Sequence, residues 1–119
     1  MTIKLTEESD RAYLEEIDVI KEIVATNYGV MTTDIDGTSR KVPLPMIRHI
    51  AMVLSYRLAG ASLWDVAEAF KKDNHGGVCH AIDATRARCD TDKKFKNAFM
   101  VLEDRCRLAI INLRNLKKR

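Results

Sequence analysis

The sequence predicts an all-α fold, a helical bundle that contains a helix-turn-helix and ends in a long C-terminal helix. Apolar residues recur at intervals of three and four along most of the chain, which is the periodicity of amphipathic helices. Two short segments of this kind, 62–70 and 74–89, flank the polar residues 71–73, and this arrangement is typical of a helix-turn-helix. Such a unit presents the start of its second helix to the major groove of DNA, so the chain is a candidate double-strand reader.

The composition fits one domain, residues 1–119, with a modest aliphatic core. Apolar residues make up 46% of the chain and aromatic residues only 6%, and 119 residues leave no room for a second, catalytic domain. The net charge of +3 hides an asymmetry: residues 1–38 carry three Lys or Arg and nine Asp or Glu, whereas residues 39–119 carry seventeen and eight. The later part therefore provides the cations that a phosphate-binding surface needs.

Two helices are predicted before the helix-turn-helix. The first, 6–29, has Thr6 as its N-cap and ends at Gly29, and the core helix, 43–60, begins at a pair of prolines and ends at Gly60. The polar loop between them is expected to hold one helical turn near residues 32–35. The residues expected to face the core are Tyr13, Ile17, Ile20, Val24, Tyr28, Ile47, Ile50, Ala51, Leu54 and Leu58.

The helix-turn-helix itself is assigned to residues 62–89. Ser62 and Asp65 form a short capping box at its start, and Asn74 is expected to cap the second helix. The residues expected to point inward are Val66, Ala67, Phe70, Val78, Ala81, Ile82, Thr85 and Cys89. The outward set of the second helix is small and polar and comprises His75, Gly76, Gly77, His80 and Asp83.

The last helix, 91–118, is longer than a domain of this size requires. At 1.5 Å per residue its roughly 26 residues reach about 39 Å, so its second half is expected to contact either the first helix or another subunit. Its inward residues are Phe95, Phe99, Leu102, Cys106, Ala109, Ile110 and Leu113, and the apolar stripe is widened by Leu108, Ile111 and Leu116.

The sequence pattern does not predict a metal site, a cofactor site or a catalytic site. The three cysteines form no C-x-x-C pair, and His75 and Cys79, four residues apart, lack a second pair of ligands, so no metal and no cofactor are expected. No nucleophile stands beside a base with an orienting group, so we expect no enzyme. The chain shows neither a signal peptide nor a membrane span, which together with the free cysteines predicts a soluble, cytoplasmic protein.

Three segments resemble the C-terminal DNA-binding domain of DnaA, the bacterial chromosomal replication initiator. They are Met46–Leu54, Ser62–Leu63 and Asn74–Ala81, and in that family they belong to segments that typically read R-Q-I-A-M-x-L, S-L-x-x-I-G-x-x-F-G-x-R and D-H-T-T-V-x-H-A. The similarity covers about residues 17–105. It implies a Trp-repressor-like helix-turn-helix that binds double-stranded DNA.

The resemblance also implies which part of the initiator is present. The sequence has no G-x-x-x-x-G-K-[ST] loop, the phosphate-binding motif of an ATPase domain. We therefore expect a stand-alone regulator of transcription or replication, or a phage-type protein that kept the DNA-reading part, associated with the nucleoid. Such a protein could act at promoters or origins and compete with the initiator it resembles.

Residue roles follow from the same resemblance. Arg40 matches the family's minor-groove arginine and Arg48 a phosphate-contacting arginine, while His75 is expected at base edges and His80 near the backbone. Lys41, Lys71 and Lys72 are expected to hold phosphates. The full expected DNA-binding set is Arg40, Lys41, Arg48, His49, Ser62, Leu63, Lys71, Lys72, Asn74, His75, Gly76, Gly77 and His80.

Three positions depart from the family pattern. Asn74 replaces an aspartate, and Gly76 and Gly77 replace two threonines that contact thymine methyls and phosphates. Each good base contact is worth about 1–3 kcal/mol of discrimination, so DNA affinity is predicted to persist while the preference for the family's usual site is lost. Glycines also let a helix N-terminus approach a phosphate closely.

Other interpretations remain open at this stage. Gly76 and Gly77 could merely extend the turn, so that the second helix begins at Val78 and has no groove-facing surface. Trp64 could stack against a sugar or fill a gap, and partial burial is expected. The rival function is a protein-interaction module that has lost specific DNA recognition and forms a homodimer through the C-terminal helix.

Overall fold

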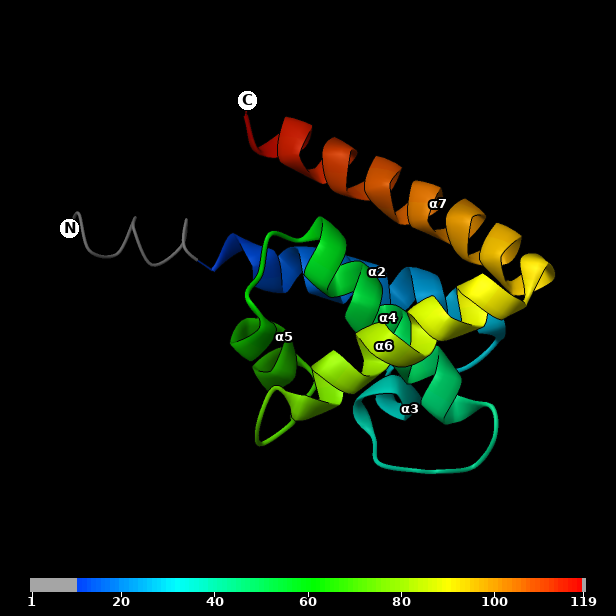
Figure 1. Ribbon diagram of the computed structural model, residues 1–119. Helices are drawn as coiled ribbons and strands as arrows, with labels where there is room; N and C mark the ends of the chain where they lie inside the picture. The colour runs from blue at the N-terminus through cyan, green and yellow to red at the C-terminus, as the bar shows by residue number, and fades with distance from the viewer. Residues whose placement is uncertain (1–10, 119) are drawn as a thin grey trace.

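The computed structural model describes residues 11–118, and within that range all regular secondary structure is helical. In chain order the helices are α2 (Ala12–Tyr28), α3 (Thr32–Asp36), α4 (Leu44–Leu58), α5 (Leu63–Ala69), α6 (Gly76–Thr91) and α7 (Lys93–Lys117). Figure 1 shows α4 and α2 at the centre of the bundle, α3 and the α5–α6 turn on its lower side, and α7 lying across the opposite side. The predicted fold class is confirmed.

The helix ends follow local signals in the sequence. Gly29 has a φ of 69° and ends α2, while Gly60, with a φ of 67°, follows Ala59, the C-cap of α4. The helical turn expected near residues 32–35 is α3. Asp92 accepts a hydrogen bond from the Phe95 amide at 3.0 Å and so starts α7. The expected N-cap of the first helix, Thr6, lies outside the described residues.

Helix α4 is the centre of the core, because it packs against α2, α6 and α7 as well as the two short helices. Side chains with less than 2% exposure come from every layer of the bundle, including Ile17, Ile35, Leu54, Phe70 and Val78. The inward residues predicted for the helices now labelled α2 and α4 are all buried or half-buried. One aliphatic core thus holds the helix-turn-helix against the rest of the chain.

The second half of α7 contacts the first helix, which is one of the two partners predicted for it. The Arg114 guanidinium donates two hydrogen bonds to the Glu16 carboxylate, at 2.8 and 2.9 Å, and the Glu16 side chain is 7% exposed. Lys117 pairs with Glu15 one turn further on. Bidentate pairs of this kind fix orientation as well as distance. The C-terminal end of α7 is therefore held against the first turns of α2.

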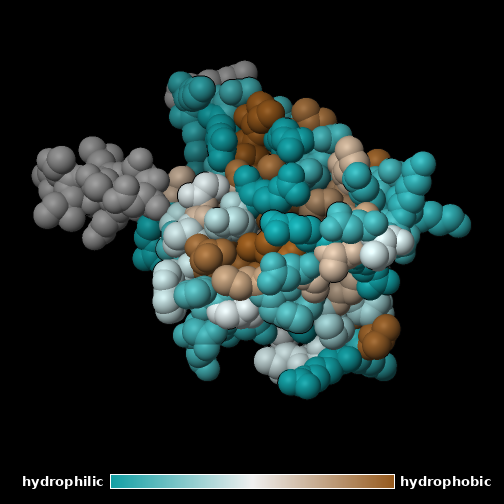
Figure 2. All heavy atoms as spheres, in the orientation of Figure 1, coloured by the Kyte–Doolittle hydropathy of each residue, from teal (hydrophilic) through white to brown (hydrophobic). Residues whose placement is uncertain are grey.

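The surface is mostly polar, with apolar side chains breaking through in places. Figure 2 shows brown, apolar spheres along the course of α7 and in the middle of the same face. Large exposed apolar residues of α7 are Met100, Val101, Leu108, Ile111 and Leu116. Among the helices of residues 11–118, none combines the length and apolarity that crossing a lipid bilayer demands.

Candidate nucleic-acid interface

The first helix of the helix-turn-helix is fixed at both ends by hydrogen bonds that the sequence encodes. Ser62 Oγ accepts from the Asp65 amide and Asp65 Oδ2 accepts from the Ser62 amide, both at 3.1 Å, so the predicted capping box is present. At the other end the Lys72 amide donates to the Ala67 carbonyl at 2.8 Å. Lys71, at φ 59°, makes the left-handed turn that this bond needs.

The second helix, α6, begins at Gly76, so the interpretation in which it begins at Val78 is wrong. His75 is the N-cap residue and has no side-chain capping bond, while Asn74 Oδ1 accepts from the Gly76 amide at 2.9 Å. The predicted capping function of Asn74 is therefore present, one residue outside the cap position. Gly76 and Gly77 are exposed, and a Cβ placed on Gly77 would meet no atom within 4 Å.

His75 and Trp64 join the two helices on their outer side. Their rings meet edge to face with centroids 4.5 Å apart, and Cys79 Sγ lies 3.5 Å from His75 Nδ1. Trp64 is nevertheless 60% exposed, which is more than the partial burial predicted for it. No group of three or more His, Cys, Asp or Glu side chains in residues 11–118 is arranged to hold a metal ion.

His49 and His80 form a second aromatic contact, between α4 and α6. Their ring centroids lie 5.3 Å apart in an edge-to-face arrangement, with His80 exposed and His49 half-buried. The pKa of His49 is lowered, first by burial and then by the charges of His80, Arg48 and Lys72. His49 is therefore uncharged at neutral pH, and its ring packs against the ring of the exposed His80.

Arg48 is not placed to contact a phosphate, which corrects its predicted role. The residue is 6% exposed, and its guanidinium donates to the carbonyl oxygens of Ile35 at 2.9 Å, Asp34 at 2.9 Å and Ser39 at 3.2 Å. The sequence cannot distinguish a buried arginine from an exposed one on the same helix. Arg48 instead holds the loop between α3 and α4 in place.

That loop carries two of the predicted cations. Arg40 and Lys41 are exposed, and the Leu44 amide donates to the Lys41 carbonyl at 2.8 Å where α4 starts. The loop and the α5–α6 turn both project toward the lower side of the molecule in Figure 1. The α5–α6 turn adds Lys71, which is exposed, and Lys72, which is half-buried.

Two other residues of the expected DNA-binding set make contacts within the protein itself. Ser62 is exposed, but its hydroxyl is engaged in the capping box. Leu63 is half-buried and packs against the core. Their contribution to a DNA surface stays a prediction.

Lys21 is a residue that the sequence analysis missed. It is 6% exposed, and its ammonium lies 2.6 Å from the Ala69 carbonyl oxygen, 2.7 Å from Asp36 Oδ1 and 4.5 Å from the centre of the Phe70 ring. It thereby ties the end of α5 to α2. A signal existed, because Lys21 interrupts the apolar stripe formed by Ile17, Ile20 and Val24.

The chain is similar to known replication initiator proteins. Chromosomal replication initiator protein DnaA of Aquifex aeolicus is 38% identical over 84 residues, which are 71% of this chain and 21% of that protein. The DnaA protein of Limosilactobacillus fermentum is 33% identical over 88 residues, 74% of this chain and 20% of that protein. The chain thus spans about a fifth of the length of these curated relatives.

Two solved structures share the fold. The crystal structure of a DNA replication initiation factor superposes with a TM-score of 0.81 at 31% identity, over 88% of this chain and 32% of that one. A replication initiator DnaA bound to AMPPCP and single-stranded DNA gives 0.73 at 32% identity, over 87% and 31%. Residues 17–84 match the family model described as the bacterial dnaA protein helix-turn-helix, and the chain therefore belongs to that family.

Proposed function

We propose that this protein binds double-stranded DNA without covalent chemistry, with the N-terminus of α6 in the major groove. The observation that carries the proposal is the open start of that helix. Gly76 and Gly77 are exposed and carry no side chain, so neither residue covers the helix start, although the Gly76 amide is bonded to Asn74 Oδ1. The helix dipole favours an anion at this position.

The surrounding cations fit the same ligand. Arg40 is proposed to enter the adjacent minor groove, and Lys41, Lys71 and Lys72 to contact phosphates on either side. The support is their placement on two loops that both project from the lower side of the molecule in Figure 1, with Arg48 acting as the residue that positions the first loop. Family membership supports DNA as the ligand rather than another polyanion.

Sequence preference is proposed to be weak. His75, which the family pattern places at base edges, is half-buried against Trp64, and the two positions after it carry no side chain. Such a surface reads backbone more than bases. We infer a regulatory role at bacterial promoters or origins, in the cytoplasm, where the protein competes with an initiator for DNA.

The proposal is tested by fluorescence anisotropy with a labelled duplex over a series of salt concentrations. Binding through phosphates predicts a linear fall of log K with log salt, with a slope of about 0.9 per phosphate contacted. Lys72→Ala should reduce the slope by about one such step and weaken all sequences alike. An affinity that does not respond to salt would contradict the proposal.

A second function is favoured by a different observation. Val101, Leu108 and Ile111 recur at intervals of seven and three on α7, are 44–63% exposed and form an apolar stripe on its outer side. This stripe supports dimerisation through α7, with or without DNA. Sedimentation velocity on the wild type and on Leu108→Gln tests it, because a dimer predicts that only the wild type sediments faster as concentration rises.

A further inference from the structure

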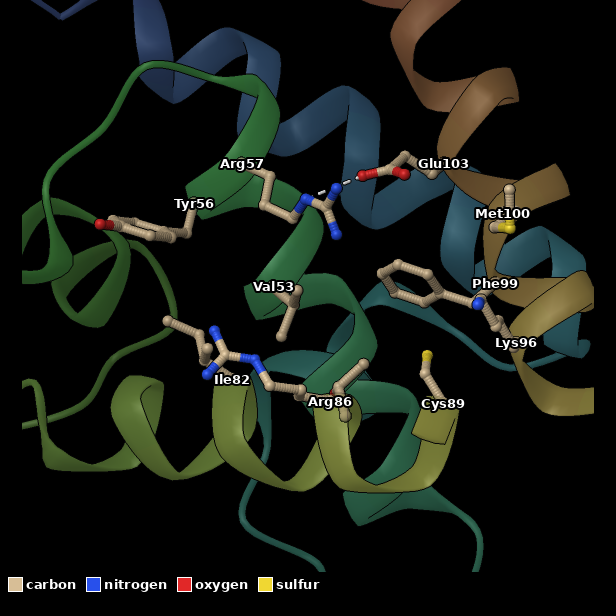
Figure 3. A pocket seen from close by; sticks show the side chains of 11 residues that line it. Val53, Tyr56, Arg57, Ile82, Arg86, Cys89, Lys96, Phe99, Met100 and Glu103 are labelled. Carbon is tan, nitrogen blue, oxygen red and sulfur yellow. Dashed lines mark ion pairs between the residues drawn. The ribbon is translucent and has the colours of Figure 1, made fainter. Parts of the chain in front are cut away.

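A groove lies where α4, α6 and α7 meet. It has a volume of about 510 Å³ and is open to solvent on one side. Figure 3 shows Val53 of α4, Ile82 of α6 and Phe99 of α7 approaching it from three directions. The volume is in the range of cavities that accept a bulky side chain or a small ligand.

The walls of the groove are apolar although they face water. Val53 and Phe99 are core residues at 4% exposure, and they close the inner end. Ile82 is half-buried, and Met100 at the outer edge is 52% exposed. An aliphatic or aromatic side chain placed here would remove apolar surface from water on three sides.

The rim of the groove is cationic. Arg57, Arg86 and Lys96 stand around it, one from each helix, and the Arg57 side chain is 52% exposed. The carboxylate in this lining belongs to Glu103, whose side chain is 10% exposed and whose Oε2 lies 2.9 Å from Arg57 Nε, as the dashed line in Figure 3 shows. Arg86 and Lys96 form no ion pair with any residue of 11–118, so the rim keeps a net positive charge.

The groove is separate from the proposed DNA surface. Ile82, Arg86 and Cys89 occupy one face of α6, because they are spaced by four and three residues. Gly76 and His80, four apart, define another face, about 80–180° away around the helix at 100° per residue. A ligand in the groove therefore leaves the start of α6 accessible.

We propose that this groove binds an acidic segment of a partner protein through one large apolar side chain. The apolar floor takes the side chain, and Arg86 and Lys96 attract carboxylates on either side of it. Nucleic acid fits less well, since phosphates gain nothing from a floor of Val53, Ile82 and Phe99. The inference does not depend on DNA binding and adds a partner that the protein could hold while bound to a duplex.

The experiment is a titration of the full chain with a synthetic probe, followed by amide and methyl NMR. The probe is a helical peptide of Glu and Ala with a single central Leu, and its twin has Ala in place of that Leu. We expect shift changes at Val53, Ile82 and Met100, and affinity at least about tenfold lower for the twin, as expected for the burial of one Leu side chain.

Matched variants separate the groove from general electrostatics. Lys96→Glu reverses a charge on the rim and should weaken the probe about fivefold, while Lys94→Glu, exposed two residues earlier and outside the groove, should change affinity by less than about twofold. Met100→Gln should likewise weaken binding, and Met31→Gln, the same change at an exposed methionine outside the groove, should not.

Four results of these titrations would overturn the proposal. They are no binding of the probe, equal effects of the two lysine variants, equal affinity for the Leu probe and its Ala twin, and shift changes centred on Gly76 and Gly77. The last would assign the peptide to the anion site at the start of α6. Sedimentation of the sample alone tests a further alternative, since a dimer that protects the same methyl groups would make a second copy the occupant and refute a partner protein.

Discussion

The Lys21 ammonium donates a hydrogen bond to the Ala69 carbonyl oxygen at 2.6 Å, and so joins the first described helix to the end of α5. The same ammonium pairs at 2.7 Å with Asp36, the last residue of α3. One buried cation thus links α2, α3 and the helix-turn-helix. The position of α5, and of the turn that follows it, depends on a residue far from any proposed DNA contact.

Lys21→Met should destabilise the fold by about 2 kcal/mol, because it leaves the Ala69 carbonyl without a donor and Asp36 without its partner. Urea unfolding followed by circular dichroism measures the change. Glu22→Gln, on the exposed side of the same helix, is the control and should shift the free energy of unfolding by less than about 0.5 kcal/mol. If both variants change the free energy of unfolding equally, the contacts of Lys21 with Ala69 and Asp36 do not stabilise the fold.

Arg48→Ala should weaken DNA binding without changing its salt dependence. The guanidinium is committed to three backbone carbonyls, so its removal loosens the loop that carries Arg40 but removes no phosphate contact. Lys41→Ala, on the same loop, should by contrast lower the salt slope by about one phosphate contact. A reduced slope for Arg48→Ala would restore the phosphate role that the resemblance implied for it.

Lys71→Gly should stabilise the protein by about 1 kcal/mol, because a left-handed backbone at φ 59° suits glycine better than lysine. The same change should weaken DNA binding through the lost charge. Lys72→Gly is the matched control, since it loses the same charge from a residue whose φ is not positive. If thermal unfolding shows the two variants to be equally stable, the backbone strain at Lys71 is negligible.

Gly77→Thr should increase sequence preference. A Cβ at this position meets open space, so the side chain that the family pattern carries there can be added without rearrangement. Selection from random duplexes should then recover a motif that the wild type enriches weakly, with about tenfold discrimination at one base pair. Gly77→Ala, which adds Cβ alone, should not recover it.

The stability of the fold should fall as pH drops below about 6.5, partly through His49. Its folded pKa is lowered by burial and by nearby cations, so the unfolded chain binds the proton more tightly. The stabilisation from neutral His49 is complete above the unfolded pKa and is lost as pH falls through the folded pKa. Unfolding of the wild type and of His49→Gln at pH 7.5 and 5.5 should give a smaller pH effect in the variant.

The helices could be predicted from the sequence because each has a regular apolar period and a stop or start residue. Gly29, Gly60 and the Ser62–Asp65 box all act where the pattern indicates. The buried position of Arg48 could not be predicted in this way, because only the neighbouring carbonyl groups decide that it lies inside. Lys21 interrupts an apolar stripe, which indicates an inward direction, but its bond to Ala69 depends on how α5 packs.

In the candidate site, too, some features could be predicted from the sequence and others could not. The exposure of Gly76 and Gly77 follows from their position at a helix start, whereas the contact between His75 and Trp64 requires the angle between α5 and α6. That angle comes from packing of Phe70 and Val78 into the core, which a one-dimensional pattern does not encode. The groove between α4, α6 and α7 is likewise a product of packing.

The exposed glycine pair at the start of α6 also changes what mutagenesis can reveal. An alanine scan works by deleting atoms, and at Gly76 and Gly77 there are none beyond the main chain to delete. Replacing either glycine by alanine adds atoms instead of removing them. Alanine scanning therefore cannot measure what the main-chain amides contribute to binding, and it reports only the steric effect of the added methyl group. Backbone chemistry, such as replacing an amide by an ester, is the appropriate probe of this stretch.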